Sequence, residues 1–142
     1  MIKTLFLSAS VFMMSYRLYS QDIIGKWKTV DDESGRIRSI VEIFETDNKY
    51  YGKIQEIFPL PGKDPDPICI YCKGKKKDQR VIGMSIIEDM EKNGDYYDSG
   101  TILDPENGNV YDCKIWLDKG NLKLRGYKYL FYRTQIWMPY DE

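Results

Sequence analysis

Three cysteines are the residues whose type and spacing most directly suggest chemistry. Cys69 and Cys72 form a C-x-x-C pair, and Cys113 lies farther along the chain. A structural disulfide is one interpretation, because oxidised thiols persist outside the cytoplasm and a cross-link lowers the entropy of the unfolded chain. A redox dithiol is another, although such pairs usually begin a helix after a strand, whereas this pair follows a proline. The third is a thiolate metal site completed by Cys113, which would need a further oxygen ligand from Asp64, Asp66 or Asp112 to make a tetrahedral set. We predict a Cys69–Cys72 disulfide, with Cys113 free or an alternative partner, and no metal site.

The carboxylates are the remaining groups that acid–base chemistry would use, because the chain contains no histidine. That composition excludes Ser-His and Cys-His nucleophile pairs and histidine metal ligands. Asp31, Asp32 and Asp104 stand in segments rich in turn residues, where aspartate is favoured by hydrogen bonds to the local backbone. We therefore predict no catalytic residue, no cofactor and no enzymatic activity.

Aromatic residues make up 14% of the chain and are candidates for ligand binding. Their rings supply apolar surface, and tyrosine and tryptophan add a polar tip. If they line the inside of a small β-barrel incompletely, they leave a pocket, and if they fill it, the protein has only a surface to offer partners. The candidate ligand-binding residues are Trp27, Tyr51, Trp116, Arg125, Tyr127 and Trp137.

The charge balance narrows the range of partners. The chain carries 21 Lys and Arg against 22 Asp and Glu, and its one basic block runs from Lys73 to Lys77. A nucleic-acid-binding protein needs a larger basic footprint, so we predict no nucleic-acid partner. The 30% share of charged residues also excludes a bundle of membrane helices.

The first twenty residues have the pattern of a secretory signal peptide. Lys3 is followed by an apolar stretch from Thr4 to Met14 that contains no charged residue. The stretch is too short to span a bilayer, which takes roughly 20 apolar residues, so we expect no stable membrane anchor. Cleavage after Ser20 divides the chain into a signal peptide, residues 1–20, and one exported domain, residues 21–142, in a periplasmic or extracellular location.

The elements that must position these residues are short strands. Alternating apolar and polar positions recur between turn signals about every ten residues, which is typical of an antiparallel all-β domain. A long loop with four prolines, residues 59–80, interrupts the series, and residues 88–93 have the composition of one helical turn. The expected strands are residues 23–30, 36–45, 49–58, 81–87, 96–103, 109–117, 121–130 and 132–138.

Seven or eight such strands bury their edges by closing a barrel or by stacking two sheets. Gly25-Lys26-Trp27 on the first strand favours the barrel, because this G-x-W resembles the motif that lipocalins place at the closed end of an eight-stranded barrel. The resemblance implies that an arginine near the chain end stacks on Trp27. Arg125 and Arg133 are the candidates, since a guanidinium over an indole contributes about 0.5–2 kcal/mol.

A wider set of short motifs resembles the DUF2147 family of small exported bacterial proteins of unknown function. The motifs lie between Gly25 and Trp137: Gly25-Lys26-Trp27, Tyr51-Gly52-Lys53-Ile54, Cys69-Ile70-Tyr71-Cys72-Lys73-Gly74, Gly100 to Gly108, Tyr111-Asp112-Cys113, Leu124-Arg125-Gly126-Tyr127 and Arg133-Thr134-Gln135-Ile136-Trp137. The resemblance implies export, a lipocalin-like barrel and no assigned activity. Lys75-Lys76-Lys77 makes this loop more basic than is usual for the family.

These observations give three hypotheses. The leading one is an exported lipocalin-like protein that binds a small hydrophobic or envelope-derived ligand and catalyses nothing. The second is an envelope structural or protein-interaction module with a filled core, and the third is a thiol-redox protein using Cys69 and Cys72. Oligomeric state is not specified by the sequence.

Overall fold

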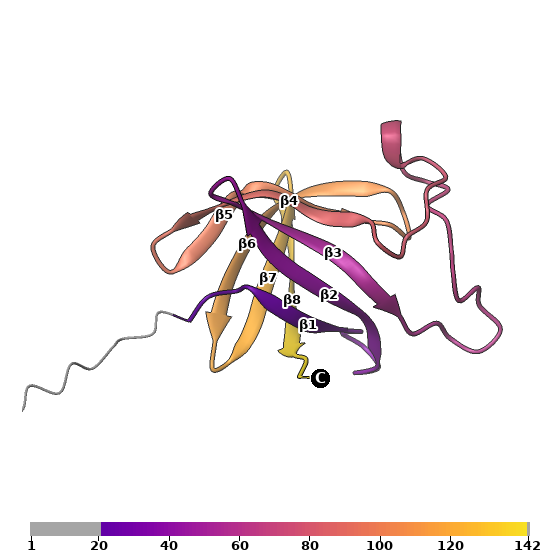
Figure 1. Ribbon diagram of the computed structural model, residues 1–142, viewed down its shortest axis with the longest axis horizontal. Helices are drawn as coiled ribbons and strands as arrows, with labels where there is room; N and C mark the ends of the chain where they lie inside the picture. The colour runs from indigo at the N-terminus through magenta and orange to yellow at the C-terminus, as the bar shows by residue number, and fades with distance from the viewer. Residues whose placement is uncertain (1–20, 142) are drawn as a thin grey trace, which may run out of the picture.

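The eight strands pair in chain order, and the last returns to the first. The structure, a computed structural model, describes residues 21–141, and the predicted signal peptide lies outside the described residues. Every neighbouring pair is antiparallel and the sheet closes into a barrel, as Figure 1 shows. The strands are β1 (Gly25–Val30), β2 (Ile37–Thr46), β3 (Lys49–Ile57), β4 (Ser85–Asn93), β5 (Tyr96–Asp104), β6 (Asn109–Asp118), β7 (Asn121–Lys128) and β8 (Phe131–Pro139). The predicted antiparallel barrel of seven or eight strands is confirmed, and it has eight.

Two strand predictions are wrong in detail. The segment 88–93 is not a helical turn but the second half of β4, paired with β5 through Glu91↔Asp98 and Lys92↔Tyr97. Asp89 has a φ of 58°, and this local irregularity interrupts the alternation that would otherwise have identified a strand. The strand also begins at Ser85 rather than Val81, because the backbone before it turns, with the Met84 amide donating to the Val81 carbonyl.

Consecutive antiparallel strands place their connections alternately at two ends of the barrel. The connections β1–β2, β3–β4, β5–β6 and β7–β8 share one end, which we call the open end. The connections β2–β3, β4–β5 and β6–β7 share the other end, which we call the closed end, and β8 also finishes there.

Buried side chains fill the closed end. Trp27 is buried, and its Nε1 donates to the Ile23 carbonyl at 2.9 Å. Tyr50 and Tyr97 meet edge to face, with ring centroids 4.7 Å apart, and the Tyr97 hydroxyl donates to Asp22 at 3.0 Å. Burial, together with the negative charge of Asp22, raises the pKa of the Tyr97 hydroxyl, so this group stays neutral.

The expected arginine stack on Trp27 is wrong for both candidates. The guanidinium of Arg125 lies over the rings of Trp116 and Tyr132, at 5.4 and 4.6 Å from their centroids. Arg133 instead pairs with Asp32. Arg125 belongs to the outward-facing set of β7, so it has no access to the core.

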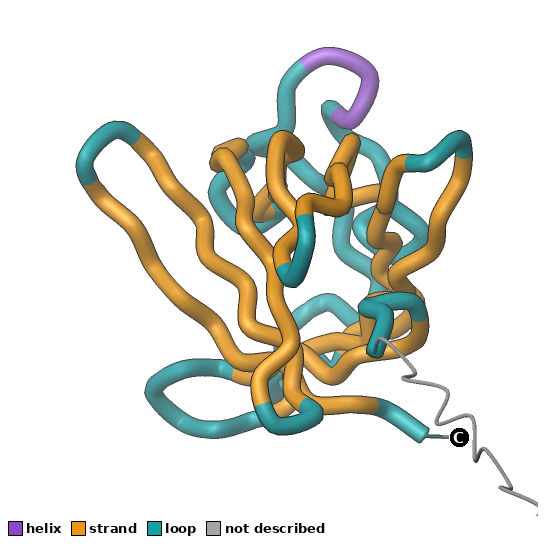
Figure 2. The backbone as a smooth tube through the Cα atoms, turned by 90° about the vertical axis from the view of Figure 1, so that its left-hand side faces the viewer, coloured by secondary structure: helices purple, strands orange, loops and turns teal. Residues whose placement is uncertain are grey.

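The long connection between β3 and β4 is held in place by its own contacts. Cys69 and Cys72 form the predicted disulfide, and both are buried. An isolated bridge joins Ile68 to Arg80. The connection also carries one short 3-10 helix, η1 (Gly74–Lys76), which stands clear of the strands in Figure 2. Within residues 21–141 there is no helix long and apolar enough to cross a membrane.

The disulfide segment packs on the β5–β6 turn. Gly108 has a φ of +71°, and a Cβ there would collide with the backbone of Tyr71 and Cys72. The Cys69 sulfur also lies 3.4 Å from the Pro105 carbonyl oxygen. Glycine at position 108 therefore allows both the turn and the close approach of the loop.

Candidate ligand-binding site

A cavity of about 740 Å³ extends into the barrel from the open end. The connections β1–β2, β3–β4 and β5–β6 contribute to its lining, together with strand residues that include both sides of the β7–β8 turn. The apolar part of the wall comes mainly from Ile54, Ile57, Ile86, Leu103, Leu124 and Trp137. Its size falls in the range of pockets that hold small molecules, about 300–1,000 Å³.

Strand alternation explains which residues face the cavity. Leu124 pairs with Gln135 and Leu122 with Trp137, so alternate residues of β7 and β8 face inward. Gly126, the next inward position of β7, has no side chain to occupy the space. A Cβ at Gly126 would lie 3.4 Å from Tyr111, an ordinary contact distance, so this glycine leaves part of the cavity empty.

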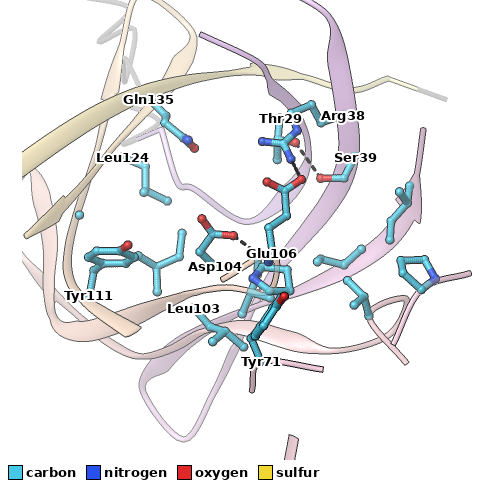
Figure 3. Close-up of a pocket in the computed structure, with 18 of the residues that line it drawn as sticks. Thr29, Arg38, Ser39, Tyr71, Leu103, Asp104, Glu106, Tyr111, Leu124 and Gln135 are labelled. Carbon is cyan, nitrogen blue, oxygen red and sulfur yellow. Dashed lines mark hydrogen bonds and ion pairs between the residues drawn. The ribbon is translucent and has the colours of Figure 1, made fainter. Parts of the chain in front are cut away.

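A few polar groups converge on the apolar wall (Figure 3). The hydroxyls of Thr29 and Ser39 are 2.7 Å apart. The indole nitrogen of Trp137 donates to the Gln135 side-chain oxygen at 3.1 Å, which orients the Gln135 amide so that its NH₂ group is available to a ligand. Tyr111 also lines this wall. Apolar walls with a few oriented polar groups are the usual composition of a small-molecule site.

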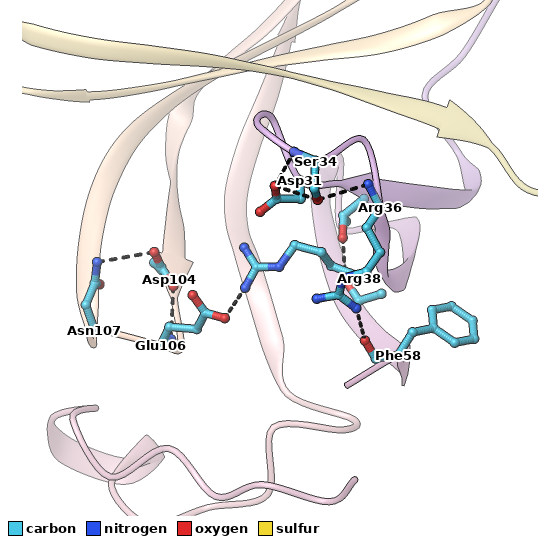
Figure 4. A network of polar contacts seen from close by, with 10 residues as sticks. Asp31, Ser34, Arg36, Arg38, Phe58, Asp104, Glu106 and Asn107 are labelled. Atoms are coloured by element: carbon cyan, nitrogen blue, oxygen red, sulfur yellow. Dashed lines mark hydrogen bonds and ion pairs between the residues drawn. The ribbon is translucent and has the colours of Figure 1, made fainter. Parts of the chain in front are cut away.

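Charged residues surround the mouth, where they connect separate parts of the open end. Arg38 of β2 forms an ion pair with Glu106 in the β5–β6 turn, as Figure 4 shows. Arg36 donates to the Phe58 carbonyl at 2.6 Å, which fastens the start of the long connection. These contacts hold β2, the long connection and the β5–β6 turn in fixed positions around the opening.

The aspartates that an acid–base site would need instead accept hydrogen bonds within turns. Asp31 accepts hydrogen bonds from the backbone amide and the hydroxyl of Ser34, each at 2.8 Å. The hydrogen bond from the Ser34 amide is the leading cause of the lowered pKa of the Asp31 carboxyl group. Asp104 accepts from the Glu106 amide at 2.9 Å and from the Asn107 side chain at 3.2 Å (Figure 4). Both residues therefore stabilise turns, as predicted from their positions.

The third cysteine is isolated from the first two. Cys113 is free and buried, and burial raises the pKa of its thiol, which keeps it protonated. Across residues 21–141, no cluster of three or more cysteine or carboxylate residues has the arrangement to hold a metal ion.

Only one of the six candidate ligand-binding residues lines the cavity. Trp137 does, whereas Trp27 lies in the core of the closed end. Tyr51 donates to Asp89 at 2.9 Å, its ring stacking on Phe44. The others, Trp116, Arg125 and Tyr127, are outward-facing residues of β6 and β7.

The predicted ligand-binding set does not include Gln135, Gly126, Leu124 or the Thr29–Ser39 pair, all of which line the cavity. The signal for them was available in the strand alternation, because Gln135 is two residues from Trp137 and Leu124 is two from Gly126. Using that signal requires the register between neighbouring strands, which shows that both pairs face the same space.

Comparison with known proteins agrees with this architecture. Residues 25–138 match the model of DUF2147, described as an uncharacterized protein conserved in bacteria. The chain belongs to the DUF2147 family. A solved structure with a similar fold is described as "Protein HP1028 from the human pathogen Helicobacter pylori belongs to the lipocalin family", at a TM-score of 0.71 and 17% identity. The match covers 85% of this chain and 84% of that one, so this DUF2147 protein has a lipocalin-like fold. No curated protein matches the chain.

Proposed function

We propose that this DUF2147 protein is an exported, non-enzymatic binding protein that holds one small, largely apolar ligand inside the barrel. The observation that carries the proposal is the cavity of about 740 Å³, which is open at one end and lined by apolar strand residues. A module with a filled core, the alternative from the sequence, would have no such space. The Cys69–Cys72 disulfide is compatible with an oxidising compartment.

The wall indicates the chemistry of the ligand. Leu124, Ile54 and Trp137 offer an apolar surface to its body, and the Gln135 amide offers a hydrogen-bond donor. A ligand that carries one carbonyl, ether or hydroxyl oxygen on an otherwise apolar frame satisfies both. Burying the apolar frame supplies most of the binding free energy, at about 25 cal/mol per Å².

Gly126→Leu provides a direct test, because the new side chain projects into the cavity from a position with room for a Cβ. The probe is N-phenylnaphthylamine, a neutral apolar dye whose fluorescence rises in dry surroundings. We expect saturable binding at one site per chain in the wild type and at least about tenfold weaker binding in the variant, since the lost contact area is that of a leucine side chain.

Ile136→Ala is the matched control, because Ile136 lies on the same pair of strands but is exposed on the outside. It should bind the dye as the wild type does. Thermal unfolding of all three proteins shows whether the barrel is intact. Absence of saturable binding by the wild type, or equal binding by Gly126→Leu, refutes a ligand site inside the barrel. Turnover of a substrate that depends on one cavity side chain would instead refute the non-enzymatic part of the proposal.

A further inference from the structure

Four consecutive apolar residues are exposed at the tip of the β7–β8 hairpin. Tyr129, Leu130, Phe131 and Tyr132 have exposed fractions of 93, 95, 80 and 63%. The hairpin turn lies at the open end, opposite the end where β8 finishes (Figure 1). Phe131 and Tyr132 also line the cavity mouth. An exposed apolar group of this kind, beside a binding cavity, marks an interaction surface.

The backbone conformation of this turn does not favour the apolar residues that occupy it. Lys128 pairs with Phe131, so Tyr129 and Leu130 form the whole turn, and Tyr129 has a φ of 57°. This conformation favours glycine and is unfavourable for a bulky side chain. Two turns at the closed end use ordinary turn residues, Asp47-Asn48 and Lys119-Gly120. Apolar residues at 129–130 therefore reflect a requirement other than turn formation.

The long connection adds more apolar surface around the same mouth. Leu60, Ile68, Ile70 and Tyr71 are each about half exposed or more, and all four line the cavity. Together with residues 129–132 they form what we call the apolar rim. The rim surrounds the opening through which a ligand enters, so whatever covers the rim lies directly over the entrance.

Positive charge lies beside the apolar rim. A second depression, of about 350 Å³, is lined by Lys73, Lys76 and Lys128 and by no carboxylate. Lys76 is paired with Glu88 at 2.9 Å. Within residues 21–141, neither Lys73 nor Lys128 forms an ion pair with a carboxylate. The Lys128 ammonium group lies 5.8 Å from the centroid of the Tyr111 ring, a contact that does not neutralise its charge. Both ammonium groups can therefore attract an anionic partner next to the hairpin tip.

We propose that the open end docks reversibly on a lipid bilayer that contains anionic phospholipids. Tyrosine, phenylalanine and leucine at a convex tip insert at the boundary between headgroups and acyl chains, and adjacent lysines attract phosphate groups. A two-residue tip is suited to a fluid surface, which needs no matching pocket. Docking goes beyond ligand binding, and it would place the mouth of the cavity against the lipid surface.

The test measures co-sedimentation of the protein with vesicles made of equal parts phosphatidylglycerol and phosphatidylethanolamine. The double variant Tyr129→Gly, Leu130→Ser removes the apolar tip and supplies residues that suit the turn, so the hairpin is expected to form as well as before. We expect at least about tenfold weaker vesicle binding, because two side chains lose their apolar contact with lipid. Lys119→Ser, which removes a charge at the closed end, should leave binding unchanged.

The charge contribution is tested separately with Lys73→Gln and with vesicles of phosphatidylcholine alone. Both changes should weaken binding, by about fivefold for the loss of one lysine near an anionic surface. Vesicle binding and dye binding should also be lost in different variants. Gly126→Leu should lose the dye and keep the vesicles, whereas the tip variant should do the reverse, so each proposal fails independently of the other.

Three results would overturn the docking proposal. The first is failure of the wild type to sediment with the anionic vesicles, and the second is sedimentation of the tip variant equal to that of the wild type. The third is a wild-type dimer in size-exclusion chromatography that becomes monomeric in the tip variant without any vesicle binding, which would assign the apolar rim to a second copy of the chain.

Discussion

Gly108→Ala tests how the disulfide segment is seated on the β5–β6 turn. Alanine in the left-handed conformation costs about 1–2 kcal/mol, and position 108 has a φ of +71°. The new methyl group would also overlap the backbone of Tyr71 and Cys72, which a flexible side chain cannot relieve. Overpacking of this kind costs about 1–3 kcal/mol more. The expected destabilisation is therefore about 2–5 kcal/mol.

Gly120→Ala is the matched control for this measurement. Gly120 also has a positive φ, +81°, but a Cβ there has nothing within 4 Å. Its cost is the backbone term alone, about 1–2 kcal/mol. Urea unfolding followed by tryptophan fluorescence gives both free energies, and limited trypsin cleavage in the segment Lys73–Lys77 reports whether the loop has left the turn. Equal destabilisation by the two substitutions, or an unchanged cleavage rate in Gly108→Ala, would refute the seating of the loop on Gly108.

Three further predictions concern the core and the response to pH. Trp27→Ala should destabilise the protein by about 3–5 kcal/mol in urea unfolding, because the side chain is buried in the closed end; a change under about 1 kcal/mol contradicts this placement. The pKa of the Cys113 thiol is raised by burial, so as pH rises past the ordinary thiol pKa of 9.0 the thiol ionises in the unfolded chain before it does in the folded one. The melting temperature should therefore fall as pH rises past 9, and it should fall less in Cys113→Ala. The lowered pKa of Asp31 gives stability that is present above pH 3.8 and lost as pH falls below it, and acid titration of Ser34→Ala should show a smaller loss.

The strands were predictable because one face of each is buried. In β2, for example, Val41 and Ile43 are buried while Glu42 between them is not, and this alternation is visible in the sequence. The turn at Asp104–Gly108 and the Cys69–Cys72 disulfide were predictable for a similar reason, since each depends on residues near one another in the chain. Local chemistry determined all of these features.

The cavity was not predictable in the same way. Whether a barrel is filled depends on which inward residues meet across its interior, and Gly126 matters only because Tyr111 and Ile102 are its neighbours. The fate of Arg125 has the same cause: the register of β6, β7 and β8 sets it between Trp116 and Tyr132, on the outside. Aromatic composition alone did not distinguish an inward ring from an outward one.

The junction between β1 and β8 has a consequence for how the barrel forms and opens. Two residue pairs join these strands, Trp27↔Pro139 and Lys28↔Met138, and proline has no amide hydrogen to contribute. Just beyond β8, the Tyr140 amide adds one hydrogen bond to the Lys26 carbonyl at 3.0 Å. Every other neighbouring pair is formed by strands adjacent in the chain, so these seven pairs can form before the two ends of the chain must meet. Pairing of β1 with β8 therefore comes last in folding, and it carries the entropic cost of closing a loop of more than a hundred residues. The same junction is the weakest in the native state, so the amide hydrogens of β1 that face β8 should exchange with solvent before those of β6 and β7.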